Sequence, residues 1–220
     1  MLLLSCFLFS SLLAAGPVFY PKFSQTFKEN MTYPVVGTGS TVGTYYYNYD
    51  KKLTRIDRDN GKWDRYCGSE KWLRNTKCSH LVSDGIRYLH FPELNYCCRC
   101  CDASKGCGVV KPDWAVDATF VEEYKNDQGL LIEKWSKKGN QDNFLHVTKD
   151  KTIVYRIDMI PNDFQEFDVS SFKNDFDDAI FNLPQICNKE SYCSLLSTCG
   201  AIRAGDLVSS WLEYLLGFSF

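Results

Sequence analysis

The stretch YCCRCCDASKGC, residues 96–107, contains five cysteines, and three kinds of chemistry use cysteines at such spacing. Two overlapping C-x-x-C pairs, Cys97 with Cys100 and Cys98 with Cys101, have the spacing of a zinc knuckle or of a redox-active dithiol. The βαβ pattern expected around a thioredoxin-like dithiol does not accompany them. Disulfide bonds are the third use, and the compartment in which the chain folds decides among the three.

The N-terminal residues 1–16 are uncharged, rich in Leu and Phe, and end in Ala-Ala-Gly. This pattern is typical of a secretory signal peptide, although its first part carries no Lys or Arg. The run is shorter than the roughly 20 apolar residues that span a bilayer, which disfavours a retained anchor. Removing residues 1–16 takes Cys6 from the 11 cysteines and leaves an even number, as complete pairing requires. In a secretory context the sequon Asn30-Met31-Thr32 is a predicted N-glycosylation site at Asn30.

Adjacent cysteines in an extended chain point in diverging directions, so a bond between neighbours is strained. The four cysteines at 97, 98, 100 and 101 are therefore expected to have separate partners elsewhere. The predicted disulfide framework consists of Cys67, Cys78, Cys97, Cys98, Cys100, Cys101, Cys107, Cys187, Cys193 and Cys199. Its pairing stays open at this point. We expect the stretch to be a covalent junction that ties the N-terminal hairpin region and the C-terminal segment to the central strands.

Extended segments separated by turn residues dominate the rest of the chain. Residues 41–61, TVGTYYYNYDKKLTRIDRDNG, have a hairpin pattern, with Asp50, Lys51 and Lys52 between two runs rich in Tyr, Thr and Ile. Further strands are predicted in GIRYLHF, DATFVEEY, LLIEKWS, NFLHVT and TIVYRIDMI. The pattern predicts a mainly β fold, an antiparallel meander with few short helices.

Helical signals are few and lie near the C-terminus. A short helix or turn is predicted after Ser170 and is ended by Pro184. Residues 200–220 are predicted to form an amphipathic tail. Its apolar residues at helical spacing are Val208, Trp211, Leu212 and Leu215. The tail is too short to span a bilayer and lacks the polar spacer of a GPI signal, so it packs on the body or contacts a membrane interface. Residues 17–199 contain no linker or repeat and are expected to form one domain.

Charge and composition exclude one class of partner. The chain has 25 Lys and Arg against 27 Asp and Glu, a net charge of −2. No basic cluster is interleaved with aromatic residues, so a nucleic-acid partner has no electrostatic support. With 45% hydrophobic residues the chain has ample material for a packed core.

Residues that could carry catalysis are few. None of the three histidines belongs to an H-E-x-x-H motif, and a G-x-S-x-G elbow is missing. Cys78 near His80 would suit thiol catalysis only if its sulfur were unpaired. A hydrolase would need two members of one set to meet in one pocket: His80, His90, His146, Glu122 and Asp158. We expect no catalytic residue, no metal site and no cofactor.

The order of the segments resembles that of the ependymin-related proteins, secreted glycoproteins with a LolA-like half-barrel. The matching segments are YYYNYDKKLTRID, LHFPELNYCCRC, PDWAVDATFVEEY, LLIEKWS, FLHVT, TIVYRIDMIPNDFQEFDVSSF and FNLPQIC, within residues 41–187. The doubled cysteines resemble a divergent, cysteine-rich form found in protists. The extra cysteines at 97–107 and the continuation past Cys187 differ from the vertebrate pattern.

This resemblance implies a strongly curved antiparallel sheet, a half-barrel, around an apolar pocket for lipids or other hydrophobic molecules. It also implies frequent homodimers, and an extracellular or endolysosomal and vacuolar location. One alternating set of side chains from each strand would line the pocket. The predicted lining residues are Tyr45, Tyr47, Phe120, Trp135, Phe144, Tyr155 and Ile157. An ordinary filled core is the alternative for each of them.

The sequence therefore predicts a secreted or lumenal, disulfide-stapled protein that binds a lipid or other hydrophobic ligand without bond chemistry. The alternatives are a structural or adhesion protein, which predicts a filled sheet interior, and a secreted hydrolase.

Overall fold

The computed structural model describes residues 15–138, 142–159, 162–188 and 191–205. Their strands are β1 (Lys22–Tyr33), β2 (Gly37–Asn48), β3 (Leu53–Arg58), β4 (Cys78–Ser83), β5 (Ile86–Phe91), β6 (Tyr96–Asp102), β7 (Thr119–Lys125), β8 (Leu131–Lys138), β9 (Asp142–Thr148), β10 (Val154–Met159) and β11 (Asp163–Phe167). They form one antiparallel sheet in the order β6-β5-β4-β3-β2-β1-β11-β10-β9-β8-β7.

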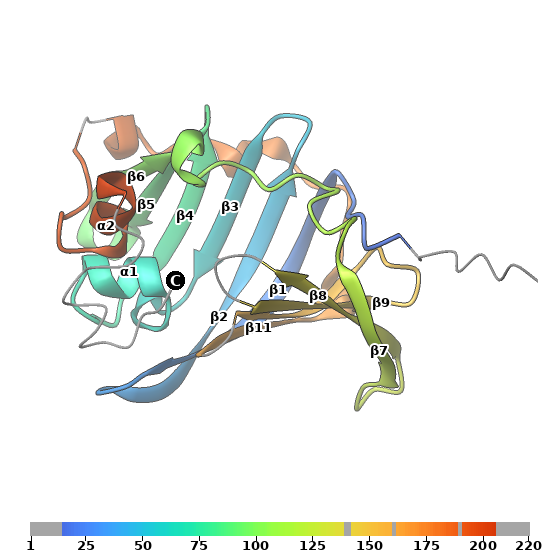
Figure 1. Cartoon of the computed structure of the whole chain (residues 1–220). Helices are drawn as coiled ribbons and strands as arrows, with labels where there is room; N and C mark the ends of the chain where they lie inside the picture. Colours follow the sequence, from blue (N-terminus) through green and yellow to red (C-terminus); the bar gives the residue numbers. More distant parts are fainter. Residues whose placement is uncertain (1–14, 139–141, 160–161, 189–190, 206–220) are drawn as a thin grey trace, which may run out of the picture.

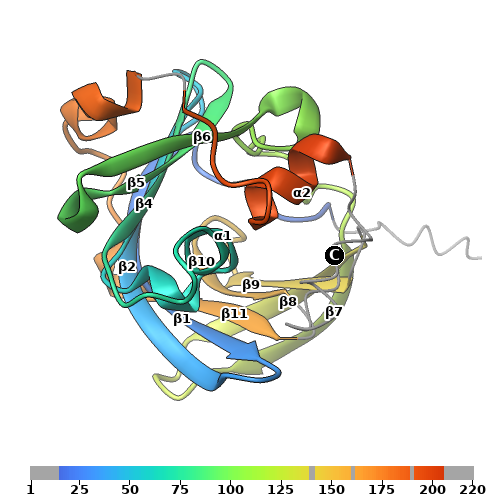
Figure 2. The ribbon, with the colours of Figure 1, turned by 90° about the vertical axis from the view of Figure 1, so that its left-hand side faces the viewer.

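The sheet is strongly curved around an interior, as Figure 2 shows, and its described strands leave β6 and β7 as two open edges. It consists of two meanders, β1–β6 and β7–β11, which meet where β1 pairs with β11 and Phe27 lies opposite Phe167. Between them the chain crosses from one edge to the other through residues 103–118, along the upper rim of the sheet in Figure 1. The expected mainly β, strongly curved antiparallel sheet is confirmed.

The predicted hairpin at residues 41–61 is present as β2 and β3, joined by a turn at residues 49–52. Before it, β1 and β2 form the longest hairpin of the sheet, with a register from Lys22 opposite Asn48 to Tyr33 opposite Gly37. Gly37 has a φ of 90°, a conformation that side chains disfavour, and this glycine lets the chain reverse direction there.

Four strands lie where none was predicted, namely β1, β4, β6 and β11. In β1 and β11 the side chains on the interior face include polar residues, since Gln25, Glu29 and Gln165 are all buried. Such strands lack the alternation of apolar and polar residues from which strands are predicted. In β6 the cysteines themselves form the strand, with burial on both of its faces.

Two short helices lie near β6. Helix α1 (Arg65–Glu70) lies inside the curve of the sheet, and the Asp64 side chain caps it by accepting a hydrogen bond from the Cys67 backbone at 2.7 Å (Figure 2). Helix α2 (Thr198–Ala204) packs against α1 and β6 and ends at Gly205. The domain boundary expected after Cys199 therefore falls inside α2. Where a short helix or turn was predicted, the chain forms a 3₁₀ turn at residues 169–171, which contains Ser170, and a second at residues 178–181.

The two edge strands are protected in different ways. Arg99 of β6 donates its backbone N–H to Ser191 at 2.8 Å and accepts from Cys193 at 3.0 Å, so a segment of chain covers part of that edge. Strand β7 is exposed over almost its whole length and carries the charged residues Glu122 and Glu123. Charges on an open edge oppose pairing with other strands.

Candidate functional site

An apolar cavity of about 150 Å³ lies on the concave face, over the central strands of the sheet. Its lining residues are Phe19, Phe23, Tyr45, Tyr47, Val110, Trp114, Val154, Ile157 and Phe167. Strands β1, β2, β10 and β11 supply six of them, and the remaining three come from segments without regular structure. A cavity of this size accommodates a body about as large as benzene.

One wall of the cavity is the segment 103–118 between β6 and β7, which we call the strap. The Tyr47 hydroxyl donates a hydrogen bond to the Val110 carbonyl at 2.7 Å and holds the strap to β2. The backbone N–H of Phe19 donates to the Pro112 carbonyl at 3.0 Å, which ties the strap to the N-terminal segment. The Trp114 ring lies 6.3 Å from the Phe19 ring, centre to centre. Segments about 90 residues apart in the chain thus close the cavity together.

The predicted pocket residues are divided by the structure into three groups. Tyr45, Tyr47 and Ile157 line the cavity. Trp135 is 1% exposed and lies in the adjoining apolar core, and Phe120 packs edge-on against it with ring centres 5.4 Å apart. Trp135 follows the alternative, since it fills the core of the β7–β11 meander, whereas Phe120 is 47% exposed and neither fills the core nor lines the cavity.

Phe144 and Tyr155 lie on the opposite, outer face, so their placement in the pocket is corrected. Leu145, and not Phe144, lies opposite Ile157 on the neighbouring strand and faces the interior with it. In β10 the register shifts after Val154, and Tyr155 borders a groove on the outer face. A strict period of two fails across such a bulge because one extra residue moves the following side chains to the other face.

Sequence reasoning missed most of the lining. Phe23 and Phe167 belong to β1 and β11, the two strands whose interior faces carry polar residues. Because those strands were not predicted, alternation along them could not identify either residue as facing the interior. Phe19, Val110 and Trp114 lie outside any strand, where periodicity carries no information.

A buried group of charged and polar side chains lies in the same concave interior. Arg58 of β3 donates hydrogen bonds from Nε and Nη2 to the Glu29 carboxylate, and Nη2 lies 3.3 Å from Asp64. Gln165 donates to Glu29 at 2.8 Å, and His80 Nε2 donates to Asp64 at 2.9 Å. Charges in an interior require such partners, because an unpaired buried charge is costly.

The buried carboxyl groups differ in their protonation. Burial raises the pKa of Asp64, but the neighbouring Arg58 and His80 outweigh it and hold this pKa below its ordinary value. Burial and the charge of Glu29 raise the pKa of Asp163 well above its ordinary value. Burial also lowers the pKa of His80, although Asp64 opposes the shift. Asp64 is therefore an anion that fixes Arg58, whereas Asp163 favours its neutral form.

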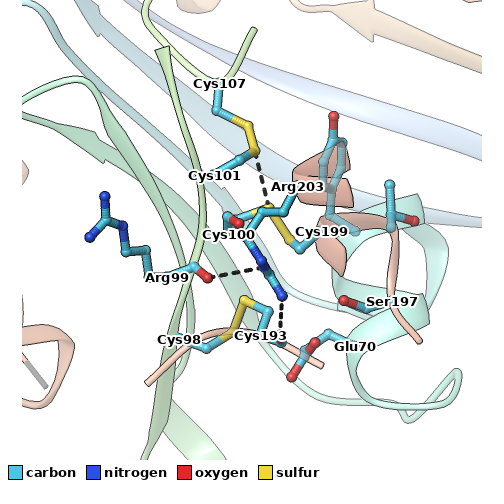
Figure 3. Close-up of a disulfide and its surroundings, with 12 residues drawn as sticks. Glu70, Cys98, Arg99, Cys100, Cys101, Cys107, Cys193, Ser197, Cys199 and Arg203 are labelled. Carbon is cyan, nitrogen blue, oxygen red and sulfur yellow. Dashed lines mark hydrogen bonds between the residues drawn. A yellow bond between two sulfur atoms is a disulfide. The ribbon is translucent and has the colours of Figure 1, made fainter. Parts of the chain in front are cut away.

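The cysteine stretch forms a disulfide junction, drawn in Figure 3. Three bonds connect β6 to the C-terminal segment: Cys97–Cys187, Cys98–Cys193 and Cys100–Cys199. Arg203 of α2 lies among them and donates hydrogen bonds to the Cys100 carbonyl at 2.7 Å and the Cys193 carbonyl at 2.6 Å (Figure 3). The expectation that neighbouring cysteines have separate partners is confirmed.

The other two bonds correct the expected junction. Cys67 pairs with Cys78, and Cys101 pairs with Cys107 inside the stretch. No disulfide therefore ties the N-terminal hairpin to β6, because both upstream cysteines are used in one local bond. The Cys101–Cys107 bond fixes the start of the strap to β6.

Groups of cysteine, histidine and acid side chains close enough for a metal ion each contain a complete disulfide among the described residues. They are Cys67, Cys78 and His80; Glu70, Cys98 and Cys193; and Cys100, Cys101 and Cys107. Metal binding by cysteine requires a thiolate, which a disulfide sulfur cannot provide. These groups are therefore structural while their disulfides are intact.

Two of the five residues considered for hydrolysis meet. His146 Nε2 lies 3.1 Å from Asp158, and His146 Nδ1 lies 2.8 Å from the Tyr124 hydroxyl, on the outer face. His146 is 6% exposed, and both of its ring nitrogens have partners, so neither is open to a substrate. His90 lies apart from them in β5, and Glu122 pairs with Lys134 at 3.5 Å.

Glycosylation, the signal peptide, the C-terminal tail and the homodimer stay predictions. Asn30 lies in β1, half-buried on the outer face in a polar groove of about 300 Å³, and its glycosylation stays a prediction. Residues 1–14 of the expected signal peptide and residues 206–220 of the expected tail lie outside the described residues. Within the described ranges no helix is long and apolar enough to cross a membrane. The expected homodimer and the membrane contact of the tail stay predictions.

Comparisons with known proteins add likenesses of fold. No family model and no curated protein matches the chain. An uncharacterized conserved protein from Thermus thermophilus is similar in structure, with 13% identity, a TM-score of 0.47, and coverage of 74% of this chain and 86% of that one. A LolA superfamily protein from Nitrosomonas europaea has 8% identity and a TM-score of 0.35 over 76% of this chain and 93% of its own. A DUF1329 family protein from Desulfovibrio piger has 11% identity and a TM-score of 0.36 over 74% and 90%. At these low scores the description of the fold rests on strand order and curvature alone.

Proposed function

We propose that this protein is a non-enzymatic carrier that binds a lipid or other hydrophobic ligand in the cavity between the sheet and the strap. The observation that carries the proposal is the lining of this cavity, which consists of nine aromatic and aliphatic residues. Burial of apolar surface releases about 25 cal/mol per Å² and needs no reacting group. The volume of about 150 Å³ suits a small apolar body or one end of a longer chain.

The setting of this function is part of the same proposal. Five disulfides support folding in an oxidising compartment, in agreement with secretion or delivery to an endolysosomal or vacuolar lumen. Assignment to the ependymin-related proteins, from the order of sequence segments, agrees with a curved sheet around an apolar cavity. The adhesion alternative expects a filled sheet interior, and the cavity argues against it.

The experiment begins with the purified protein, which is extracted with organic solvent and analysed by mass spectrometry for bound lipid. A panel of fluorescent fatty acids of increasing length is then titrated. We expect Ile157→Trp to fill the cavity and to weaken binding at least about tenfold, the effect of losing roughly 1.4 kcal/mol.

Tyr155→Trp is the matched control, because it adds the same ring two residues away on the outer face. It should leave binding unchanged. The proposal is wrong if no lipid co-purifies and no probe binds, or if both variants weaken binding equally.

A further inference from the structure

Arg87 of β5 is a cation on the concave face that has no ionic partner among the described residues. Across the neighbouring strands Arg87 lies opposite Val82, Val82 lies opposite Thr54, and Thr54 lies opposite Tyr47, which lines the cavity. The centre of its guanidinium lies 5.2 Å from the centre of the Tyr66 ring, which α1 places inside the curve. Its Nε is buried without a hydrogen-bond partner.

One part of this half-buried side chain is unfavourable for the stability of the fold. Its Nε–H donor is withdrawn from water without an acceptor. The nearby Arg58 shows the usual solution, since Glu29 and Asp64 neutralise it. An apolar side chain at position 87 would pack on Tyr66 without this cost. The position of Arg87 therefore points to an anion that is not part of the described chain.

Tyr45 connects this cation with the cavity. Its ring lines the cavity, and its hydroxyl makes no hydrogen bond within the described residues. Tyr45 lies opposite Ile56, and Ile56 lies opposite His80, whose ring lies 5.3 Å, centre to centre, from the Tyr66 ring that Arg87 covers. Burial raises the pKa of Tyr45 to about 12, and the charges of Arg87 and Arg58 act against this rise. One further donor, Arg58 Nη1, is buried without a partner. An anionic oxygen beside Tyr45 would thus find a neutral hydroxyl donor and the charge of Arg87, since Glu29 and Asp64 already neutralise Arg58.

We propose that the ligand of the cavity is an amphipathic carboxylate, whose head binds Arg87 beside Tyr45 and whose apolar part occupies the cavity. This inference rests on the proposed function and specifies its ligand class. The planar guanidinium matches a carboxylate with two parallel hydrogen bonds, an arrangement that combines strength with orientation. The small cavity favours a medium-length acyl chain or a single ring over a long chain.

The test compares three ligands of equal chain length, octanoate, octanol and octyl phosphate, by calorimetric titration at neutral pH and moderate salt. We expect octanoate to bind the unchanged protein about 10- to 100-fold more tightly than octanol, the range for hydrogen bonds to a charged group. Arg87→Met should remove this advantage and leave octanol binding unchanged. The Arg87→Met protein should also unfold at a temperature no lower than that of the unchanged protein, because an unpaired cation is lost.

Arg99→Met is the matched control. Arg99 also lies over a tyrosine ring, 5.4 Å from the centre of Tyr192, but on the outer face of β6 beside Tyr88. It should leave octanoate binding unchanged, and Arg87→Gln serves as a second variant if Arg87→Met misfolds.

The outcomes separate this inference from the proposed function. Equal binding of octanol and octanoate overturns the carboxylate site and leaves the hydrophobic carrier intact. Octyl phosphate binding more tightly than octanoate overturns the carboxylate as the head group. Equal losses in the Arg87 and Arg99 variants overturn the role of Arg87. Failure of all three ligands, together with the absence of any co-purifying lipid, contradicts the proposed function itself.

Discussion

Arg58 and Glu29 form an ion pair inside the curved sheet, with side chains that are 3% and 2% exposed. The two residues lie on β3 and β1, and β2 runs between these strands. Their side chains therefore bridge across β2 on the concave face, where its residue Gly43 lies opposite both Phe27 and Arg58. A Cβ atom at Gly43 would lie 2.8 Å from the Phe27 ring, and the centre of the Arg58 guanidinium lies 5.5 Å from the centre of that ring. The glycine thus leaves room in the central strand for the ring that the guanidinium of the ion pair covers.

This ion pair gives the first prediction. Arg58→Met should lower the free energy of unfolding by about 3–5 kcal/mol, because it leaves Glu29 and Asp64 buried without their cation. Urea unfolding followed by circular dichroism measures the change. Arg55→Met is the control, since Arg55 pairs with Asp57 on the outer face with side chains 24% and 32% exposed, and its loss should cost under about 1 kcal/mol. Similar losses of unfolding free energy in both variants would show that the buried ion pair matters no more for stability than the half-exposed one.

Asp163 gives a prediction for the pH dependence of stability. Its Oδ1 is buried without a hydrogen-bond partner among the described residues, and burial raises its pKa well above the ordinary value. A carboxyl group with a raised pKa in the folded state contributes its full stability below the pKa of the unfolded chain, about 4, and loses it as the pH rises through the folded pKa. Asp163→Asn removes this loss. We expect the variant to gain about 1 kcal/mol over the unchanged protein near pH 8.

The measurement is a series of urea unfolding curves from pH 4 to pH 8. The difference between variant and unchanged protein should be smallest near pH 4 and should increase with pH. Asp57→Asn is the control, because Asp57 lies on the outer face and pairs with Arg55. A difference for Asp163→Asn that stays constant over the whole range is incompatible with a titrating buried carboxyl group.

The sequence predicted the fold class because most strands alternate and turn residues separate them. It failed for β1 and β11, whose interior positions hold Gln25, Glu29 and Gln165. These polar residues are stabilised by partners on other strands, such as Arg58, and such partners are invisible to local periodicity. The helix α1 was missed for a similar reason, since it is six residues long and depends on its cap and its disulfide.

The candidate site was predictable only in part. Alternation in a clear hairpin predicted that Tyr45 and Tyr47 face the cavity. Tyr155 was placed on the wrong face, because the register shifts between Val154 and Arg156 and no residue type there predicts the bulge. Residues of the strap enter the cavity through the topology of the whole sheet. Nothing in the local sequence marks Arg87, because the argument for its role is that its buried Nε has no hydrogen-bond partner among the described residues of the folded chain.

The disulfides give the last prediction, which depends on the length of chain that each bond closes. Cys100 and Cys199 are 99 positions apart, whereas Cys101 and Cys107 are six apart. Cys97–Cys187 and Cys98–Cys193 already join the same two segments, so the Cys100–Cys199 bond closes only about eight further residues, two in β6 and six in the C-terminal segment. The chain-entropy model therefore gives roughly 2 kcal/mol for either bond. We expect the double substitutions Cys100→Ala/Cys199→Ala and Cys101→Ala/Cys107→Ala to destabilise the protein by similar amounts in guanidinium unfolding.

The Cys101→Ala/Cys107→Ala variant should act on the cavity, because the Cys101–Cys107 bond fixes the start of the strap. Hydrogen exchange in residues 108–114 should accelerate in this variant, while exchange in β6 stays slow because three further disulfides hold that strand. In the Cys100→Ala/Cys199→Ala variant we expect the reverse, with faster exchange in α2 and little change in the strap. Identical exchange patterns in the two variants would contradict this division between a bond that secures the C-terminal segment and a bond that positions the cavity wall.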